Sequence, residues 1–145
     1  MREKNTVYLL KRADLAFEKI ANRMLSPYKI THTQFKFLRY LSKFLDGQLR
    51  QHDVELYFDM TNPTVTRVLQ NLEKDGWVYR QSHTKDRRSK YLYLTDFAKE
   101  RIPELAELGV ALEQQLTQRL NNEEFDLLQD LLRKMLSISI DEGKV

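Results

Sequence analysis

The 145-residue sequence contains no cysteine, which excludes disulfide bridges, thiolate metal sites and thiol-based redox sensing. No apolar run approaches the roughly 18 residues that a membrane-spanning helix needs. The first fifteen residues are charged throughout and lack the apolar centre of a secretory signal. These absences predict a cytoplasmic protein that does not associate with membranes.

Catalytic and metal-binding patterns are also missing. The three histidines, His32, His52 and His83, are far apart and lack the spacing of metal ligands. The chain has only 4 glycines and no Gly-rich phosphate-binding loop. It shows no nucleophile motif and no carboxylate pair in a recognisable frame. We therefore expect no enzyme activity, no cofactor and no metal.

Positive charge is unevenly distributed, although the net charge is only +3. Residues 1–50 hold 11 Lys/Arg against 4 Asp/Glu, whereas residues 103–145 hold 4 against 9. Residues 78–91 hold five basic residues against Asp86 alone. Such a local concentration indicates contact with a polyanion, and the alternative is an ordinary solvated turn.

The two ends of the chain are predicted to form amphipathic helices. Apolar residues recur about every 3.5 residues over residues 4–24, which predicts a first helix there. A second helix over 35–45 follows a capping box at Thr31 and Gln34, and Asp46-Gly47 closes it. Thr95 caps a helix to about residue 120, which Pro103 should kink or interrupt. Asn121 and Glu124 form a capping box for a last helix.

The centre of the chain combines short helices with a hairpin. A helix over 51–58 is followed by a turn and a helix that starts at Asn62 as N-cap and ends at Gly76. Strands over about 77–82 and 90–94 flank the basic loop. The predicted fold is mainly α (α+β), a winged helix-turn-helix with N- and C-terminal helices.

The helix after Asn62 has one apolar face and one polar face. Its apolar residues, Val65, Val68, Leu69 and Leu72, fall within one arc and should face the core. Arginine and glutamine on the outer face suit guanine and adenine, and small hydroxyls near a helix N-terminus suit phosphate. The candidate DNA-binding residues of this helix are Asn62, Pro63, Thr64, Thr66, Arg67 and Gln70. The alternative is an ordinary solvated helix face.

The hairpin loop supplies four further candidates, Lys85, Asp86, Arg87 and Arg88. An arginine at a hairpin tip can enter a narrow, electronegative minor groove and read its width. A carboxylate among these cations would not attract phosphate. We expect Asp86 instead to brace a neighbouring arginine or the turn amides.

Three segments together resemble the MarR family of transcriptional regulators: THTQFKFLRYL, NPTVTRVLQNLEKDGWVYR and DRRSKYLYLT. The resemblance implies one domain over 1–145, with a DNA-binding lobe at 31–95 and dimerisation helices at 1–30 and 96–145. It implies a homodimer on a pseudo-palindromic operator. The family's Asp-x-Arg wing motif falls on Asp86 and Arg88. The chain departs from the family pattern at Arg50, Glu55 and Asp59.

The resemblance also allows a small aromatic or anionic effector that releases DNA. The residues in the right region are Tyr28, His32, Phe35 and Arg39, and core packing is their alternative role. We expect a sequence-specific double-stranded DNA-binding regulator, with repression as the favoured mode. The alternative is a winged-helix dimer that binds proteins and not DNA.

Overall fold

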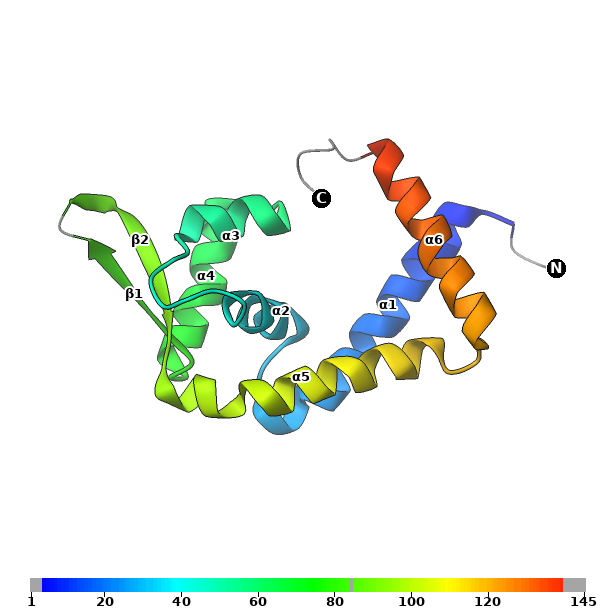
Figure 1. The fold of residues 1–145 in the computed structure, drawn as a ribbon, viewed down its shortest axis with the longest axis horizontal. Coiled ribbons are helices and arrows are strands. Elements are labelled where there is room, and N and C mark those ends of the chain that lie inside the picture. Colours follow the sequence, from blue (N-terminus) through cyan, green and yellow to red (C-terminus); the bar gives the residue numbers. More distant parts are fainter. Residues whose placement is uncertain (1–3, 84, 140–145) are drawn as a thin grey trace. The chain divides into compact units, whose positions relative to one another are not determined.

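The computed structural model describes residues 4–83 and 85–139. It confirms the mainly helical fold with one two-stranded antiparallel sheet. The elements in chain order are α1 (Thr6–Leu25), a 3-10 turn (Ser26–Tyr28), α2 (His32–Leu41), α3 (Gln51–Phe58), α4 (Asn62–Lys74), β1 (Val78–His83), β2 (Asp86–Leu94), α5 (Asp96–Thr117) and α6 (Asn122–Ser139). Figure 1 shows the β1–β2 hairpin projecting beyond α3 and α4 as a wing.

The chain divides into two compact units, residues 1–112 and 113–145, with the division inside α5. The hydrophobic core of the first unit draws on α1 to α5 and on both strands. Its fully buried side chains include Phe37 and Leu38 of α2, Val54 of α3 and Leu92 of β2. Burial of one such leucine or phenylalanine contributes about 1.5–3 kcal/mol, so this core holds the first unit together.

The capping box before α2 is confirmed, but the predicted bounds of that helix are wrong. The Gln34 amide N–H donates to Thr31 Oγ1 at 3.2 Å, and the Thr31 N–H donates to Gln34 Oε1 at 2.8 Å. The helix therefore begins at His32, directly after its cap, and not at Phe35. It ends at Leu41, because the next residues form tighter turns in which the Lys43 and Phe44 N–H groups bond three residues back.

Helix α4 is capped one residue earlier than predicted. Thr61, not Asn62, is the N-cap, and its hydroxyl accepts from the Thr64 N–H at 3.4 Å. Both residues are good caps, so sequence alone did not separate them. The predicted core face is confirmed, since Val65, Leu69 and Leu72 are fully buried. Gly76, at φ +82°, ends the helix as expected.

The wing is longer than predicted, because β2 begins at Asp86 and not near Lys90. Most of the basic residues predicted for a loop therefore lie in a strand. The segment before α3 also pairs with β2. The Gly47 N–H donates to the Leu92 carbonyl at 3.1 Å, and the Leu92 N–H donates to the Leu49 carbonyl at 2.9 Å. These bonds fix the base of the wing to the rest of the lobe.

The C-terminal helices follow their predicted caps. The Thr95 hydroxyl accepts from the Ala98 N–H at 3.1 Å. Helix α5 then runs through Pro103 to Thr117, so Pro103 does not interrupt it, and a kink at Pro103 stays a prediction. Asn121 and Glu124 form the second capping box, with bonds of 2.8 and 3.0 Å. Over the described residues, none of the helices combines the length and apolarity needed to span a membrane.

The turn at Gly47 gives a stability test. A Cβ there would lie 2.6 Å from the Tyr93 hydroxyl, and the residue has φ +72°. We expect Gly47→Ala to lower the unfolding free energy by about 2–4 kcal/mol, from left-handed strain plus overpacking. Urea unfolding measures the loss.

Gly76→Ala is the matched control, because Gly76 has φ +82° but nothing within 4 Å of the position that an added methyl group would take. Its unfolding free energy should fall only by the cost of the left-handed backbone conformation, about 1–2 kcal/mol. Equal losses for the two variants would show that Tyr93 does not crowd the turn.

Candidate nucleic-acid interface

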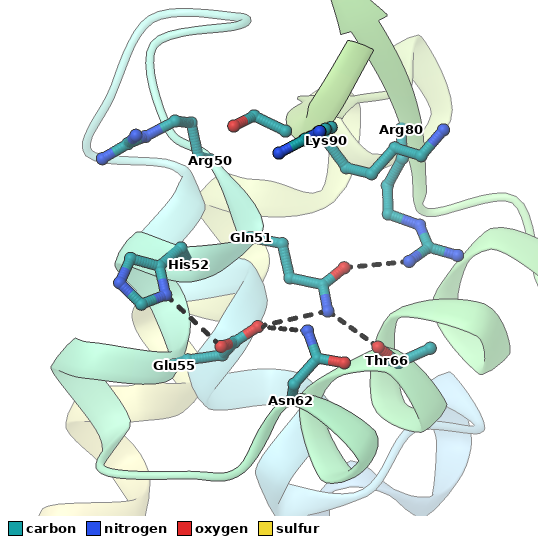
Figure 2. Close-up of a pocket in the computed structure, with 10 residues that line it drawn as sticks. Arg50, Gln51, His52, Glu55, Asn62, Thr66, Arg80 and Lys90 are labelled. Carbon is teal, nitrogen blue, oxygen red and sulfur yellow. Dashed lines mark hydrogen bonds and ion pairs between the residues drawn. The ribbon is translucent and has the colours of Figure 1, made fainter. Parts of the chain in front are cut away.

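An open hollow of about 280 Å³ lies where α3, the start of α4 and both strands of the wing meet. Figure 2 shows side chains from all of these elements converging on it. Its lining residues are Arg50, Gln51, His52, Glu55, Asn62, Thr66, Arg80, Arg88, Ser89 and Lys90. The hollow therefore brings three predicted DNA-binding residues, Asn62, Thr66 and Arg88, into one place.

Arg80 connects the wing to the helices. It follows Val78 by two residues in β1, so its side chain lies on the inward face of the strand. The guanidinium Nη1 donates to Gln51 Oε1 of α3 at 2.9 Å, and Nε forms a short ion pair with Glu73 of α4. The side chain of Arg80 is only 17% exposed. An arginine this buried needs such partners, because an unpaired buried charge is costly.

Gln51 extends the hydrogen-bond network from Arg80 to α4. Its Nε2 donates to Thr66 Oγ1 at 2.7 Å and to Glu55 Oε2 at 3.4 Å. Glu55 Oε2 also accepts from Asn62 Nδ2 at 2.8 Å. Two candidate DNA-binding side chains, Asn62 and Thr66, are thus held by hydrogen bonds from α3 (Figure 2).

The outer face of α4 is arranged as the sequence predicted. Pro63, Arg67 and Gln70 are exposed, whereas Thr64 and Thr66 are half-buried at its edges. Lys74 continues the exposed face into the last turn. Because the first turn of a helix has N–H groups without intrahelical partners, the start of α4 also suits an anion.

The wing exposes its cations. Lys85, Arg87 and Arg88 are all exposed, and Lys85 lies at the turn. The Ser82 hydroxyl donates to the Arg87 carbonyl at 3.3 Å, and Lys90 Nζ donates to Ser82 Oγ at 3.0 Å. Asp86 pairs with His83 across the hairpin, but its side chain, with the predicted brace, lies outside the described part of the chain.

Helix α3 has an unusual cap. The N-cap residue is Arg50, and the Asp53 carboxylate accepts from the Arg50 backbone N–H at 2.9 Å. Its oxygens also accept from the Arg50 guanidinium at 3.4 and 3.3 Å. Burial alone would raise the pKa of Asp53, but the backbone and side-chain hydrogen bonds from Arg50 outweigh burial and lower it. Asp53 thus supplies the return bond of a capping box, from the third helical position to the N–H of the N-cap residue.

The four effector candidates line the contact of α2 with α1 and α5. His32 is buried, lies 2.6 Å from Glu18 Oε1 through its Nδ1, and stacks on Phe35 with centroids 6.3 Å apart. The Tyr28 hydroxyl donates to Glu104 Oε2 at 3.0 Å, and this bond raises the tyrosine pKa. Arg39 Nε lies 4.0 Å from where a Cβ on Gly109 would be. The structure brings His32 and Phe35 together, and Phe35 Cζ lies 3.4 Å from the same Gly109 position that Arg39 approaches, whereas Tyr28 contacts Glu104.

Sequence reasoning missed the supporting residues Gln51, Glu73 and Arg80. A signal for Arg80 was present, because it shares the inward face of its strand with Val78 and an inward arginine requires an acceptor. Gln51 and Glu55 are four residues apart and therefore share one face of α3. What the sequence could not indicate was that this face meets Thr66 and Asn62 of α4.

The MarR family model matches residues 30–90, the part of the chain that builds this interface. Over 92% of the chain, the sequence is 26% identical to an uncharacterized HTH-type transcriptional regulator, YwoH, of Bacillus subtilis (strain 168), and it spans 95% of that relative. It is 29% identical to the transcriptional repressor MprA of Escherichia coli (strain K12) over 80% of the chain, and spans 66% of MprA.

The fold is also similar to a solved protein–DNA complex. The crystal structure of S. aureus MepR with DNA matches with a TM-score of 0.85 and 30% sequence identity. The match covers 93% of this chain and 98% of the MepR chain. The likeness therefore extends beyond residues 30–90 to the helices on both sides of them.

The Asp53 cap predicts a pH-dependent stability. The pKa of Asp53 is lower in the folded state than in the unfolded chain. The stabilisation by Asp53 is therefore fully present at pH values above its ordinary pKa of 3.8, and it is lost as the pH falls through the lower folded-state pKa. We expect Asp53→Ala to lower the unfolding free energy by about 1 kcal/mol at neutral pH, and by less at acid pH. Urea unfolding across this pH range measures the difference.

Arg50→Ala should cause part of the loss of stability that Asp53→Ala causes, because it removes the guanidinium bonds to Asp53 but leaves the bond from the backbone N–H. A difference between wild type and Asp53→Ala that grows toward acid pH would contradict the account.

Proposed function

The chain belongs to the MarR family, and from this premise we propose that it regulates transcription as a homodimer that binds a pseudo-palindromic operator. Sequence-specific binding to double-stranded DNA is its biochemical activity. The observation that carries the proposal is the hollow in which Asn62 and Thr66 of α4 meet Arg88 and Lys90 of the wing. Repression by occupying the operator is the mode we favour, in keeping with the name of MprA.

We propose that α4 reads the major groove. Arg67 and Gln70 are exposed on its outer face and have the side chains that pair with guanine and adenine. Asn62, Pro63, Thr64 and Thr66 lie in its first turns, where N–H groups and small polar side chains suit phosphate and nearby base edges. Residues 31–95 are the corresponding DNA-binding lobe.

The wing has a separate role in the proposal. Arg88 enters the adjacent minor groove, while Lys85 and Arg87 contact phosphates and Asp86 shapes the turn. The exposure of all three cations supports this assignment. An arginine is favoured in a narrow minor groove because the negative potential is strongest there.

Dimerisation through residues 1–30 and 96–145 is supported by apolar side chains left exposed on the terminal helices. Val7, Leu10 and Leu15 of α1 are exposed by 61%, 40% and 57%. In α6, exposed apolar residues recur at helical spacing: Leu127, Leu128, Leu131, Met135 and Leu136. Apolar stripes of this length are typical of interfaces. Two-fold symmetry would place the two α4 helices about one DNA turn, roughly 34 Å, apart.

Three further assignments complete the proposal. A small aromatic or anionic effector would act near Tyr28, His32, Phe35 and Arg39, between α2 and the helices packed on it.

The relatives named above are regulators, which supports a role without catalysis. The relatives are bacterial, and the chromosome of a bacterium lies in its cytoplasm, which supports a cytoplasmic location. The competing function, protein binding by a dimer that has lost DNA affinity, is disfavoured by the exposed cations of the wing.

A salt titration of operator binding separates the two functions. A dimer that neutralises about eight phosphates should give a log–log slope of affinity against salt near −7. The operator is first recovered by selection from fragmented genomic DNA with the purified protein. A slope near zero would exclude a DNA-binding role.

The wing assignment is tested by Arg88→Ala, with Arg87→Ala as the matched control. Both residues are exposed cations on the same strand. Arg88→Ala should weaken operator binding by about 1–3 kcal/mol and relax specificity at the contacted position. Arg87→Ala should weaken all sequences alike and reduce the salt slope by about 1. Identical profiles for the two variants would show that Arg88 does not read DNA.

A further inference from the structure

An acidic residue lies beneath the proposed reading surface. The Glu55 side chain is only 13% exposed. Its carboxylate accepts from Asn62 Nδ2 at 2.8 Å and Gln51 Nε2 at 3.4 Å, and it lies 3.5 Å from His52 Nδ1. A negative charge next to DNA phosphates opposes binding, so a role in attracting DNA does not account for it.

The contact with Glu55 fixes which way the Asn62 amide points. An ionised carboxylate only accepts hydrogen bonds, so the atom of Asn62 that faces it must be Nδ2. The amide oxygen, Oδ1, is then directed away from Glu55, as Figure 2 shows. Asn62 therefore presents an acceptor at a position where a free asparagine could present either an acceptor or a donor.

Gln51 is oriented by the same reasoning. The Arg80 guanidinium only donates, so Gln51 must direct Oε1 to it and Nε2 to Thr66 and Glu55. The carboxylate thus receives N–H groups from both sides. This supports Glu55 in its position, and the orientation of Asn62 follows from a network that extends to β1.

The base edges in the major groove respond differently to an outward acceptor. Adenine N6 and cytosine N4 carry amino groups that can donate to it, whereas guanine O6 and thymine O4 are acceptors that cannot. An asparagine fixed in this orientation favours an amino base over a keto base. An asparagine that is free to turn its amide over accommodates both, because it can place Nδ2 where Oδ1 now lies and donate from there to the keto oxygens.

We infer that Glu55 is a specificity-determining positioning residue, which orients Asn62 to select adenine or cytosine over guanine or thymine at one operator position. The inference rests on the proposed function, since it requires the start of α4 to face base edges. Glu55 itself touches no base and acts through Asn62.

Two effects of Glu55 are separable by substitution. Glu55→Gln removes the charge but keeps a carbonyl oxygen that can accept from Asn62. Glu55→Ala removes both. Glu55→Met is a second non-accepting variant of similar length, in case the alanine variant folds poorly. Asn62→Ala identifies the operator position involved.

The experiment measures the affinity of each variant, at one fixed salt concentration, for the selected operator and for all its symmetric single-base-pair substitutions. Asn62→Ala should abolish a preference of about 5- to 150-fold at one position, the range of a single good base contact. Glu55→Ala and Glu55→Met should abolish the preference at that same position and bind the keto variants more tightly. Glu55→Gln should keep the preference with a higher affinity for every sequence.

The Asn62→Ala/Glu55→Ala double variant should lose no more selectivity than either single variant. A purely structural role for Glu55 would instead weaken all sequences equally and leave base preferences unchanged, and that result would overturn the inference. So would an Asn62→Ala variant with the wild-type preferences at every position. Thermal unfolding of each variant identifies losses due to misfolding. If the wild type itself binds no DNA, the proposed function fails with it; if it binds and the base preferences persist in the variants, the inference alone fails.

Discussion

The Arg80 guanidinium joins the wing to both helices of the helix-turn-helix. It contacts Gln51 of α3 and Glu73 of α4 from the inward face of β1. Because Arg80 is largely buried, the loss of either acceptor while the wing stays packed would leave a buried polar group without that partner. These contacts tie the wing to α3 and α4, and our proposal requires such a link if α4 and the wing are to contact two adjacent grooves in a fixed register. Leu92 adds a backbone connection from β2 to the segment before α3.

The sequence predicted capping residues well where they depend on local chemistry, even though the bounds of α2 were wrong. The capping boxes at Thr31 and Asn121, and the glycine after α4, each depend on residues within a few positions of one another. The predictions failed where competing local signals were similar, as for Thr61 against Asn62, or where a tertiary pairing extended an element, as for β2. The strand is stabilised by its partner β1 and by the segment at Leu49, and neither is visible in its own residues.

For the interface, the pattern of the sequence indicated which side chains face outward but not what holds them. Arg67 and Gln70 follow from helical periodicity alone. The partners of Asn62 and Thr66 come from α3, seven and fifteen residues earlier in the chain. Contacts of this kind depend on how two helices cross, which a single sequence does not specify. Glu55 could be identified as unusual, yet its role became apparent only when its neighbours were known.

The polar network has a consequence for binding energetics as well as for selectivity. Ordering a flexible side chain at an interface costs about 0.5–1.5 kcal/mol. Asn62 and Thr66 are already held by Glu55 and Gln51, so this cost is met during folding and not during DNA binding. The charge of Glu55 opposes that gain by repelling phosphate. The charge of Glu55 lowers the affinity for all DNA sequences alike. The fixed Asn62 amide lowers the affinity only for sequences with a keto base at the contacted position. Discrimination between sequences depends on differences in affinity, so the network favours selectivity over strength.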